Sequence, residues 1–226
     1  KGTKTVTAET VKHENHTLSK DMDVKVKDII KKELNRQKNQ LILIASENFA
    51  SQEVLRTMGS IPTNKYAEGY PGFRYYEGCE NMDDIEQLAI DRANKLFGSD
   101  YSNVQPHSGV SANMAVFLGI LNCGDKILSM NLKDGGHLSH GHKQNLSGRY
   151  YEIHTYSVNP ETEMLDYENI RKLAKAIRPK LIIAGASSYS RTIDFKKFKQ
   201  IAHEVGAYLM ADTAHIAGLI VSGQHP

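Results

Sequence analysis

The sequence lacks several features that mark particular classes of protein. Its only cysteines are Cys79 and Cys123, too few for the disulfide framework of a small secreted domain. Its 28 Lys and Arg nearly balance its 26 Asp and Glu, giving a formal net charge of +2, so no excess charge favours nucleic acid or an anionic membrane. No apolar run approaches the roughly 18 residues of a membrane span. We therefore expect a cytoplasmic protein with no nucleic-acid or membrane partner.

The apolar pattern predicts an α/β fold. Apolar stretches alternate with amphipathic segments of about three helical turns, which indicates βαβ units and a mostly parallel mixed sheet. Strands are expected at 41–44, 102–105, 126–130, 149–156, 181–183 and 208–211, and helices at 23–37, 52–58, 84–97, 112–121, 167–177 and 195–205. We expect residues 1–22 to be a flexible arm, 23–62 an N-terminal helix and segment, and 63–226 part of a large domain.

The most informative stretch is Tyr208–His215, where an apolar run ends in Asp212 and His215 follows. In an open α/β sheet the carboxyl ends of the strands face the ligand crevice. A carboxylate there can hold a proton on a heteroaromatic nitrogen, for which the ring of pyridoxal phosphate is the commonest case. Alternatively, Asp212 only caps the turn that follows the strand.

A turn at Ser108-Gly109 separates an expected strand from an expected helix. Free backbone N–H groups and the helix dipole at such a turn can bind phosphate. The turn matches neither the Walker A loop nor the G-x-G-x-x-G fingerprint. The simpler interpretation is that Ser108 caps the helix.

Three histidines, His137, His140 and His142, lie within a glycine-rich segment that begins at Gly135-Gly136. They could be metal ligands, although their spacing fits no common zinc pattern. A flat imidazole could instead stack on an aromatic cofactor, with the glycines allowing close backbone approach. The third interpretation is a surface loop with solvated histidines.

The long segment 63–78 is rich in glycine, tyrosine and charge, which is typical of a functional loop. Glu68 lies among Tyr66, Tyr70, Tyr75 and Tyr76, and apolar aromatic surroundings would suit a general acid or base. Arg74 in the same segment could hold an anion.

Taken together, these segments resemble serine hydroxymethyltransferase, a pyridoxal-phosphate enzyme of the aspartate-aminotransferase-like fold (fold type I). The matching words, in order along the chain, are Leu43-Ile-Ala-Ser-Glu-Asn-Phe-Ala-Ser51, Thr63-Asn-Lys-Tyr-Ala-Glu-Gly-Tyr-Pro-Gly72, Arg74-Tyr-Tyr76, Glu86-Gln-Leu-Ala-Ile-Asp-Arg92, Val104-Gln-Pro-His-Ser-Gly109, Gly135-Gly-His-Leu138 and Asp212-Thr-Ala-His-Ile-Ala-Gly218. The resemblance runs from about Asp23 to Pro226.

The resemblance implies a role for each matching position. Catalytic roles fall to Glu68, which would be the acid or base at the substrate hydroxyl, and to His137, Asp212 and His215 around the cofactor. The cofactor would be held by Ser108 and Gly109 at its phosphate, His137 on its ring, Asp212 at its nitrogen, Ser187 at its phenolic oxygen, and by His215 and Tyr66. Substrate positions would be Ser46, Glu68 and Tyr76 for the amino acid, and Leu132, Gly136 and Leu138 for the folate.

The implied cofactor is pyridoxal 5′-phosphate, with tetrahydrofolate as co-substrate and no metal. The reaction would interconvert serine and glycine as part of one-carbon metabolism. Tyr66, Glu68 and Tyr76 would reach the site of a neighbouring subunit, which implies a homodimer or a dimer of dimers.

Two departures from the family pattern are visible. The family's Schiff-base lysine and the arginine that binds the substrate carboxylate belong to a region further along the chain than Pro226, so we expect residues 1–226 alone to be inactive and to fold poorly. Val110-Ser111 replaces the family's usual Ser-Gln, which removes a hydroxyl near the phosphate. The alternatives are a non-catalytic paralogue that binds a ligand or partner, and a metal hydrolase built on the segment that carries His137, His140 and His142 (the His loop).

Overall fold

The computed structural model describes residue 19 and residues 21–226. The described residues up to Glu47 belong to one compact unit and Asn48–Pro226 to a second, and the expected arm at residues 1–22 falls almost wholly outside the described part. In the first unit, helix α1 (Val24–Asn39) begins at Asp23, whose side chain accepts a hydrogen bond from the Val26 amide at 3.1 Å. This cap satisfies one of the free N–H groups of the first turn.

The strand expected at residues 41–44 is absent from the first unit. Leu41 and Leu43 are each 85% exposed, and a turn follows in which the Glu47 amide donates to the Ile44 carbonyl. A short apolar run becomes a strand only where a neighbouring strand can pair with it. The described residues of this unit form no such strand, so the prediction was wrong here.

The second unit begins with helical segments and a small hairpin. Helix α2 (Gln52–Met58) and the 3₁₀ turn η2 (Ile61–Asn64) precede strands β1 (Gly69–Tyr70) and β2 (Phe73–Arg74), which pair antiparallel. Helix α3 (Glu80–Phe97) begins four residues earlier than expected. It ends at Gly98, which adopts the left-handed conformation (φ 62°) that favours glycine.

The strand expected at residues 102–105 is also absent. The Asn103 side chain accepts a hydrogen bond from the Gln105 amide at 3.0 Å, a local turn that competes with pairing in a sheet. The Gln105 side chain donates to the Gly69 carbonyl at 2.8 Å. The segment is therefore an irregular connector that joins the hairpin region to the helix that follows.

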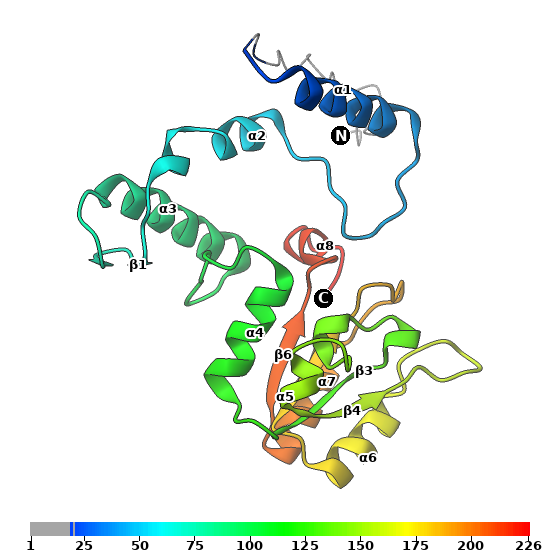
Figure 1. Cartoon of the computed structure of the whole chain (residues 1–226). Coiled ribbons are helices and arrows are strands. Elements are labelled where there is room, and N and C mark those ends of the chain that lie inside the picture. The colour runs from blue at the N-terminus through cyan, green and yellow to red at the C-terminus, as the bar shows by residue number, and fades with distance from the viewer. Residues whose placement is uncertain (1–18, 20) are drawn as a thin grey trace. The chain divides into compact units, whose positions relative to one another are not determined.

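The main sheet contains four strands in the order β4-β3-β5-β6, and every pair in it is parallel (Figure 1). The strands are β3 (Lys126–Met130), β4 (Glu152–Tyr156), β5 (Leu181–Gly185) and β6 (Tyr208–Asp212). Helix α4 (Gly109–Ile120) precedes β3 in sequence, α6 (Tyr167–Ile177) lies between β4 and β5, and α7 (Phe195–Val205) lies between β5 and β6. The predicted α/β class is confirmed. In the described residues the only antiparallel pair of strands is the separate β1–β2 hairpin.

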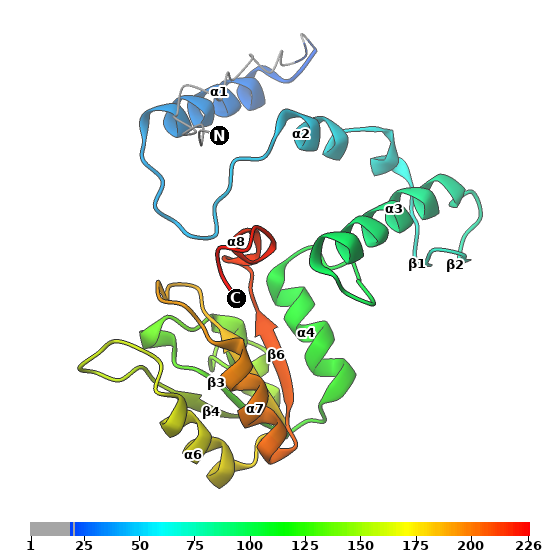
Figure 2. The ribbon, with the colours of Figure 1, turned by 180° about the vertical axis from the view of Figure 1, so that it is seen from behind.

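Both faces of the sheet are covered, which explains the continuous apolar runs of its strands. Leu128 and Ile182 belong to a core with α6 and α7, which Figure 2 shows together on one face. Ile127, Leu181 and Ile183 belong to a second core with Phe117 of α4. Successive residues of β3 and β5 thus alternate between the two cores, as the two-residue period of a strand requires.

Short elements complete the unit: η3 (Leu132–Asp134), η4 (Leu138–His140), α5 (Ser147–Tyr150) and α8 (Ala217–Val221). The strand expected at 149–156 is shorter than predicted, because one helical turn occupies Ser147–Tyr150 and β4 begins at Glu152. No helix in the described part of the chain is long and apolar enough to cross a membrane.

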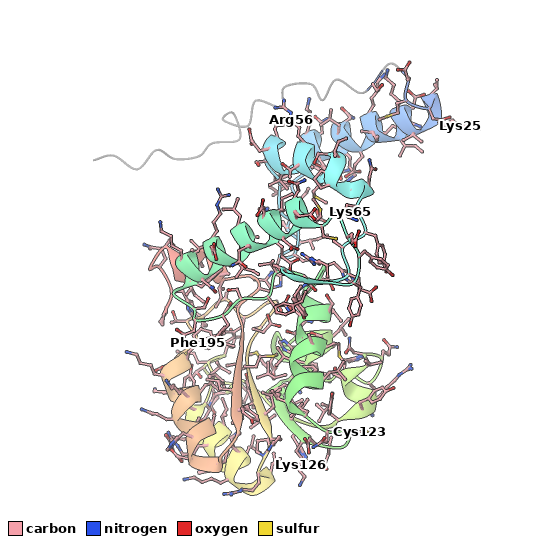
Figure 3. All side chains as sticks on the ribbon, turned by 90° about the vertical axis from the view of Figure 1, so that its left-hand side faces the viewer. Lys25, Arg56, Lys65, Cys123, Lys126 and Phe195 are labelled. Carbon is pink, nitrogen blue, oxygen red and sulfur yellow. The ribbon has the colours of Figure 1, made fainter. Side chains whose placement is uncertain are left out.

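The carboxyl ends of the strands bring several of the predicted site residues, among them His137, Ser187 and Asp212, to one edge of the sheet. Figure 3 labels Lys126 at the amino end of β3 and Phe195 at the start of α7, at opposite ends of the sheet. At the carboxyl edge, η3 and η4 follow β3, Ser187 follows β5, and Asp212 is the last residue of β6. This edge is where open α/β sheets bind their ligands.

Replacing Ile182 by Ala should destabilise the protein by about 2–5 kcal/mol, because it leaves a cavity in the central strand. Ile182 is fully buried in β5. The matched control is Lys172→Ala on the exposed side of α6, expected to change the free energy of unfolding by less than about 0.5 kcal/mol. Urea unfolding of the full-length protein measures both. Equal effects of the two substitutions would contradict the assignment of β5 to the core.

Candidate functional site

Asp212 is held at the end of β6 by hydrogen bonds to both carboxylate oxygens. Oδ2 accepts from His140 Nε2 at 2.7 Å and from Asn113 Nδ2 at 2.9 Å. Oδ1 accepts a longer bond from the Ala214 amide at 3.3 Å, so Asp212 also caps the following turn. The hydrogen bond from His140, supported by that from Asn113, holds the pKa of Asp212 far below its usual range, against the opposing effect of burial. The carboxylate is therefore ionised at neutral pH.

The same hydrogen-bond network reaches His137. Asn113 Nδ2 also donates to Ser139 Oγ at 2.9 Å, and this hydroxyl lies 2.7 Å from His137 Nδ1. The Ser139 amide donates to His137 Nδ1 at 3.1 Å. Because a backbone N–H can only donate, Nδ1 is an acceptor and the ring proton of neutral His137 lies on Nε2.

His137 is held in its neutral form. Burial lowers the pKa of His137 most, the electrostatic effects of His140 and His215 lower it further, and the Asp212 carboxylate acts in the opposite direction. The His137 and His140 rings meet edge to face with centroids 5.7 Å apart. A neutral imidazole can lie against a positively charged aromatic ring without repelling it, so the environment fits a stacking role.

The two glycines before His137 are needed for close packing of the backbone. A Cβ on Gly136 would lie 2.3 Å from the Met130 carbonyl oxygen, and Gly135 has φ +113°. The Gly135 carbonyl accepts a hydrogen bond from the Ser187 amide at 2.7 Å. This bond ties the His loop to the end of β5 and brings Ser187 to the edge that holds Asp212.

Ser108 caps α4, as the simpler interpretation of this turn predicts. Its hydroxyl accepts from the Ser111 amide at 3.1 Å, and its own amide donates to Ser111 Oγ at 3.0 Å, so Ser111 completes a reciprocal capping box. The Gly109 and Val110 amides belong to the first turn, where N–H groups have no acceptor within the helix. A Cβ on Gly109 would meet nothing within 4 Å. The cap therefore leaves two amides and open space for an anion.

A cavity of about 430 Å³ lies beside the His loop and the β3–β4 side of the sheet. Leu132, His137 and His140 contribute to its lining. Leu138, which follows His137, is 47% exposed and Leu132 is 45% exposed. These two leucines thus offer apolar contact beside the predicted ring-stacking histidine.

The tyrosine-rich loop forms a separate group beside α3. The Tyr66 and Tyr76 rings pack edge to face with centroids 5.5 Å apart. Glu68 is exposed, so the neighbouring tyrosines do not bury it as we expected. Arg74 is not free to hold an anion, because its guanidinium is bonded to Asp83 and Glu86. Ser46 is exposed in the first unit, and its predicted role stays a prediction.

Sequence reasoning missed Asn113 and Ser139, and it noticed His140 without finding its partner. Asn113 is 8% exposed and Ser139 is fully buried. The available signal was a single amide in the mostly apolar helix α4, one helical turn after Gly109. A polar residue on a buried helix face needs a hydrogen-bond partner, and here Asp212 and Ser139 are those partners.

One ring nitrogen of each histidine in this loop is already hydrogen-bonded within the protein. His137 Nδ1 bonds to Ser139, His140 Nε2 bonds to Asp212, and His142 Nδ1 accepts from the Gln144 amide at 3.3 Å. Within the part of the chain that the structure describes, no group of three His, Cys, Asp or Glu side chains could hold a metal ion.

Comparison with known proteins agrees with this geometry. Residues 19–226 match the sequence model of the family described as serine hydroxymethyltransferase. The chain belongs to the serine hydroxymethyltransferase family. It is 64% identical over 207 residues to the serine hydroxymethyltransferase of Aster yellows witches'-broom phytoplasma, an alignment that covers 92% of this chain and 48% of the relative.

Other relatives give the same picture. The serine hydroxymethyltransferase of Mycoplasma pneumoniae is 57% identical over 205 residues, covering 91% of this chain and 50% of the relative, and that of Borrelia hermsii is 59% identical over 198 residues, covering 88% and 48%. The chain spans about half the length of the curated relatives it matches. With this family membership, the parallel sheet is part of a fold-type-I large domain.

The side chains present in this chain fit pyridoxal phosphate. Asp212 is an ionised carboxylate, the partner that a protonated pyridine nitrogen needs. His137 is a neutral flat ring in the same hydrogen-bond network. The Ser108-Gly109 turn presents amides at a helix N-terminus, which is suited to a phosphate group.

Acid should remove the stabilisation that Asp212 contributes. Because the folded-state pKa of Asp212 is depressed, the unfolded chain binds a proton at this carboxyl first as pH falls, so acid favours unfolding. The difference in unfolding free energy between wild type and Asp212→Asn should be constant from pH 6 to 8 and shrink below about pH 4. Urea unfolding across this range measures it. A difference that stays constant down to pH 3 would contradict the depressed pKa.

Proposed function

We propose that the protein containing this chain is a serine hydroxymethyltransferase that uses pyridoxal phosphate to interconvert serine and glycine, with tetrahydrofolate as one-carbon acceptor. The observation that carries the proposal is the ionised Asp212, held by His140 and Asn113 at the carboxyl edge of the sheet. Membership of the family supports the choice of this reaction.

When bound, pyridoxal phosphate supplies an electron sink. Asp212 would keep a proton on the ring nitrogen, and neutral His137 would stack on the ring. Ser108 and Gly109 bind the phosphate with the amides of the first turn of α4, and Val110 contributes its amide without a hydroxyl. Ser187 donates to the phenolic oxygen. His215, which lowers the pKa of His137 electrostatically, would lie near the cofactor.

The remaining residues bind the substrates. Glu68 exchanges a proton with the hydroxyl of serine, and Ser46 and Tyr76 hold the amino acid. Leu132, Gly136 and Leu138 contact the folate along one side of the His loop. The exposed leucines and the nearby cavity support this placement.

We also propose a homodimer in which Tyr66, Glu68 and Tyr76 complete the site of the partner subunit. These three side chains are exposed, and the loop that carries them is bonded to α3 and to Gln105.

Two free cysteines, one buried and one exposed, support a reducing, cytoplasmic location.

Asp212→Asn in the full-length protein should lower the rate of serine cleavage by about 100-fold or more, because it removes a charge preorganised for the cofactor. The matched control is Asp100→Asn, an exposed carboxylate after α3, which should leave the rate within about twofold of wild type. Glycine formation from serine and tetrahydrofolate is the measurement. Absence of this activity in the wild type would reject the proposed function.

Glu68→Gln should leave cofactor binding intact and lower the serine-cleavage rate by about 10²–10⁴-fold, the usual contribution of a general acid or base. Glu77→Gln is the matched control, because Glu77 is an exposed carboxylate in the same loop. Absorbance titration reports cofactor binding and steady-state kinetics report kcat. If Glu68→Gln turned over serine like the control, the proton-transfer role would be wrong.

A further inference from the structure

Arg74 is a buried cation in the tyrosine-rich loop with an unusually complete set of partners. Its side chain is only 6% exposed. Nε bonds to Asp83 Oδ1 at 2.7 Å and Nη2 bonds to Glu86 Oε2 at 2.6 Å. Nη1 donates to two backbone carbonyls, those of Ala67 and Gly69, each at 2.8 Å. One guanidinium therefore joins α3 to the backbone of the loop.

The two carbonyls that Arg74 binds flank Glu68 directly. The Glu68 carbonyl itself accepts a hydrogen bond from the Tyr75 amide at 3.1 Å. Three consecutive carbonyls, from Ala67 to Gly69, are thus fixed by Arg74 and its neighbour. The conformation of the backbone that carries Glu68 is set by these bonds.

The Glu68 carboxylate has no comparable support of its own. Across residues 19 and 21–226, no hydrogen bond or ion pair to this carboxylate is present, and the side chain is exposed. Its direction therefore depends on the backbone from which it projects. A group that fixes this backbone also fixes the point and the direction in which the Glu68 side chain leaves it.

Other contacts hold the same loop closed around Arg74. Gly69 has φ +105°, and a Cβ there would lie 2.3 Å from the Phe73 carbonyl oxygen. Asp83 Oδ2 accepts from the Gly72 amide at 2.9 Å while its other oxygen binds Arg74. Gln105 Nε2 donates to the Gly69 carbonyl and to Glu86 Oε1. Gln105 lies three residues before Ser108, so the network connects the loop to the segment that enters α4.

We infer that Arg74 is a positioning residue for Glu68, fixing the carboxylate through the two flanking carbonyls rather than touching substrate. The inference rests on the proposed function, because it assigns to Arg74 the alignment of the proposed acid or base. Arg74→Lys is the informative substitution, since it keeps the charge but a single ammonium cannot reproduce a fork that bridges four acceptors.

The alternative is that Arg74 only staples the loop to α3 and affects the fold as a whole. A double-mutant cycle with Glu68→Gln separates the two roles. If Arg74 acts only through Glu68, replacing Arg74 should have little further effect on kcat once Glu68 has been replaced. The readouts are kcat and KM for serine and cofactor affinity, measured on the full-length protein. Arg56→Lys is the matched control, because Arg56 is exposed on α2 and is labelled in Figure 3.

Arg74→Lys should lower kcat by about 10- to 100-fold, the cost of a small misplacement of a reacting group. Cofactor affinity and KM for serine should change by less than about threefold, and Arg56→Lys should match wild type. In the Glu68→Gln background, Arg74→Lys should lower kcat by no more than about twofold. An equal drop in both backgrounds would overturn the inference and leave the proposed function standing.

If Arg74→Lys does not fold, Glu86→Gln supplies the second cycle. This variant weakens one ionic partner of Arg74 and the bond from Gln105, while both carbonyl bonds of Arg74 remain. We therefore expect kcat to fall by about threefold with Glu68 present and to remain unchanged in the Glu68→Gln background. Additive losses in this cycle would equally overturn the inference. A wild type without serine–glycine exchange would instead reject the proposed function.

Discussion

The site depends above all on the hydrogen bond between His140 and Asp212. It joins a nearly fully buried imidazole in the His loop to the last residue of β6 at 2.7 Å. Burial alone would raise the pKa of Asp212, and this bond, with that from Asn113, lowers it instead. The loop after β3 is thereby attached to the far strand β6, with β5 between them. Asp212 and His137 are thus held in one hydrogen-bond network.

The attachment of the His loop to β6 also restricts the path of the backbone on either side of it. Gly135 and Gly136 pass close to residues at the ends of β3 and β5, where a side chain would collide with backbone atoms. In the tyrosine-rich loop, the buried guanidinium of Arg74 fixes the backbone carbonyls on both sides of Glu68. In both places the backbone is immobilised first, and the functional side chain projects from it.

Much of the architecture could be predicted from the sequence, because buried parallel strands and amphipathic helices have strong periodic signals. β3 and α6 have the predicted bounds, and Gly98 ends α3 as expected. The strands predicted at 41–44 and 102–105 are absent, because strand formation depends on a pairing partner, which a local pattern does not specify. Asp212 could be found from its place after a strand. Asn113, 99 residues earlier, could be found only once folding brought it to the same carboxylate.

The most direct test of the central claim is the protonation state of the cofactor ring nitrogen in the full-length protein. Pyridoxal phosphate labelled with ¹⁵N at this position reports protonation through its NMR chemical shift. An ionised Asp212 predicts a protonated nitrogen throughout pH 6–9 in the wild type and loss of this signal in Asp212→Ala, because its acceptor is gone. An unprotonated nitrogen in the wild type, or one that stays protonated without Asp212, would contradict the account.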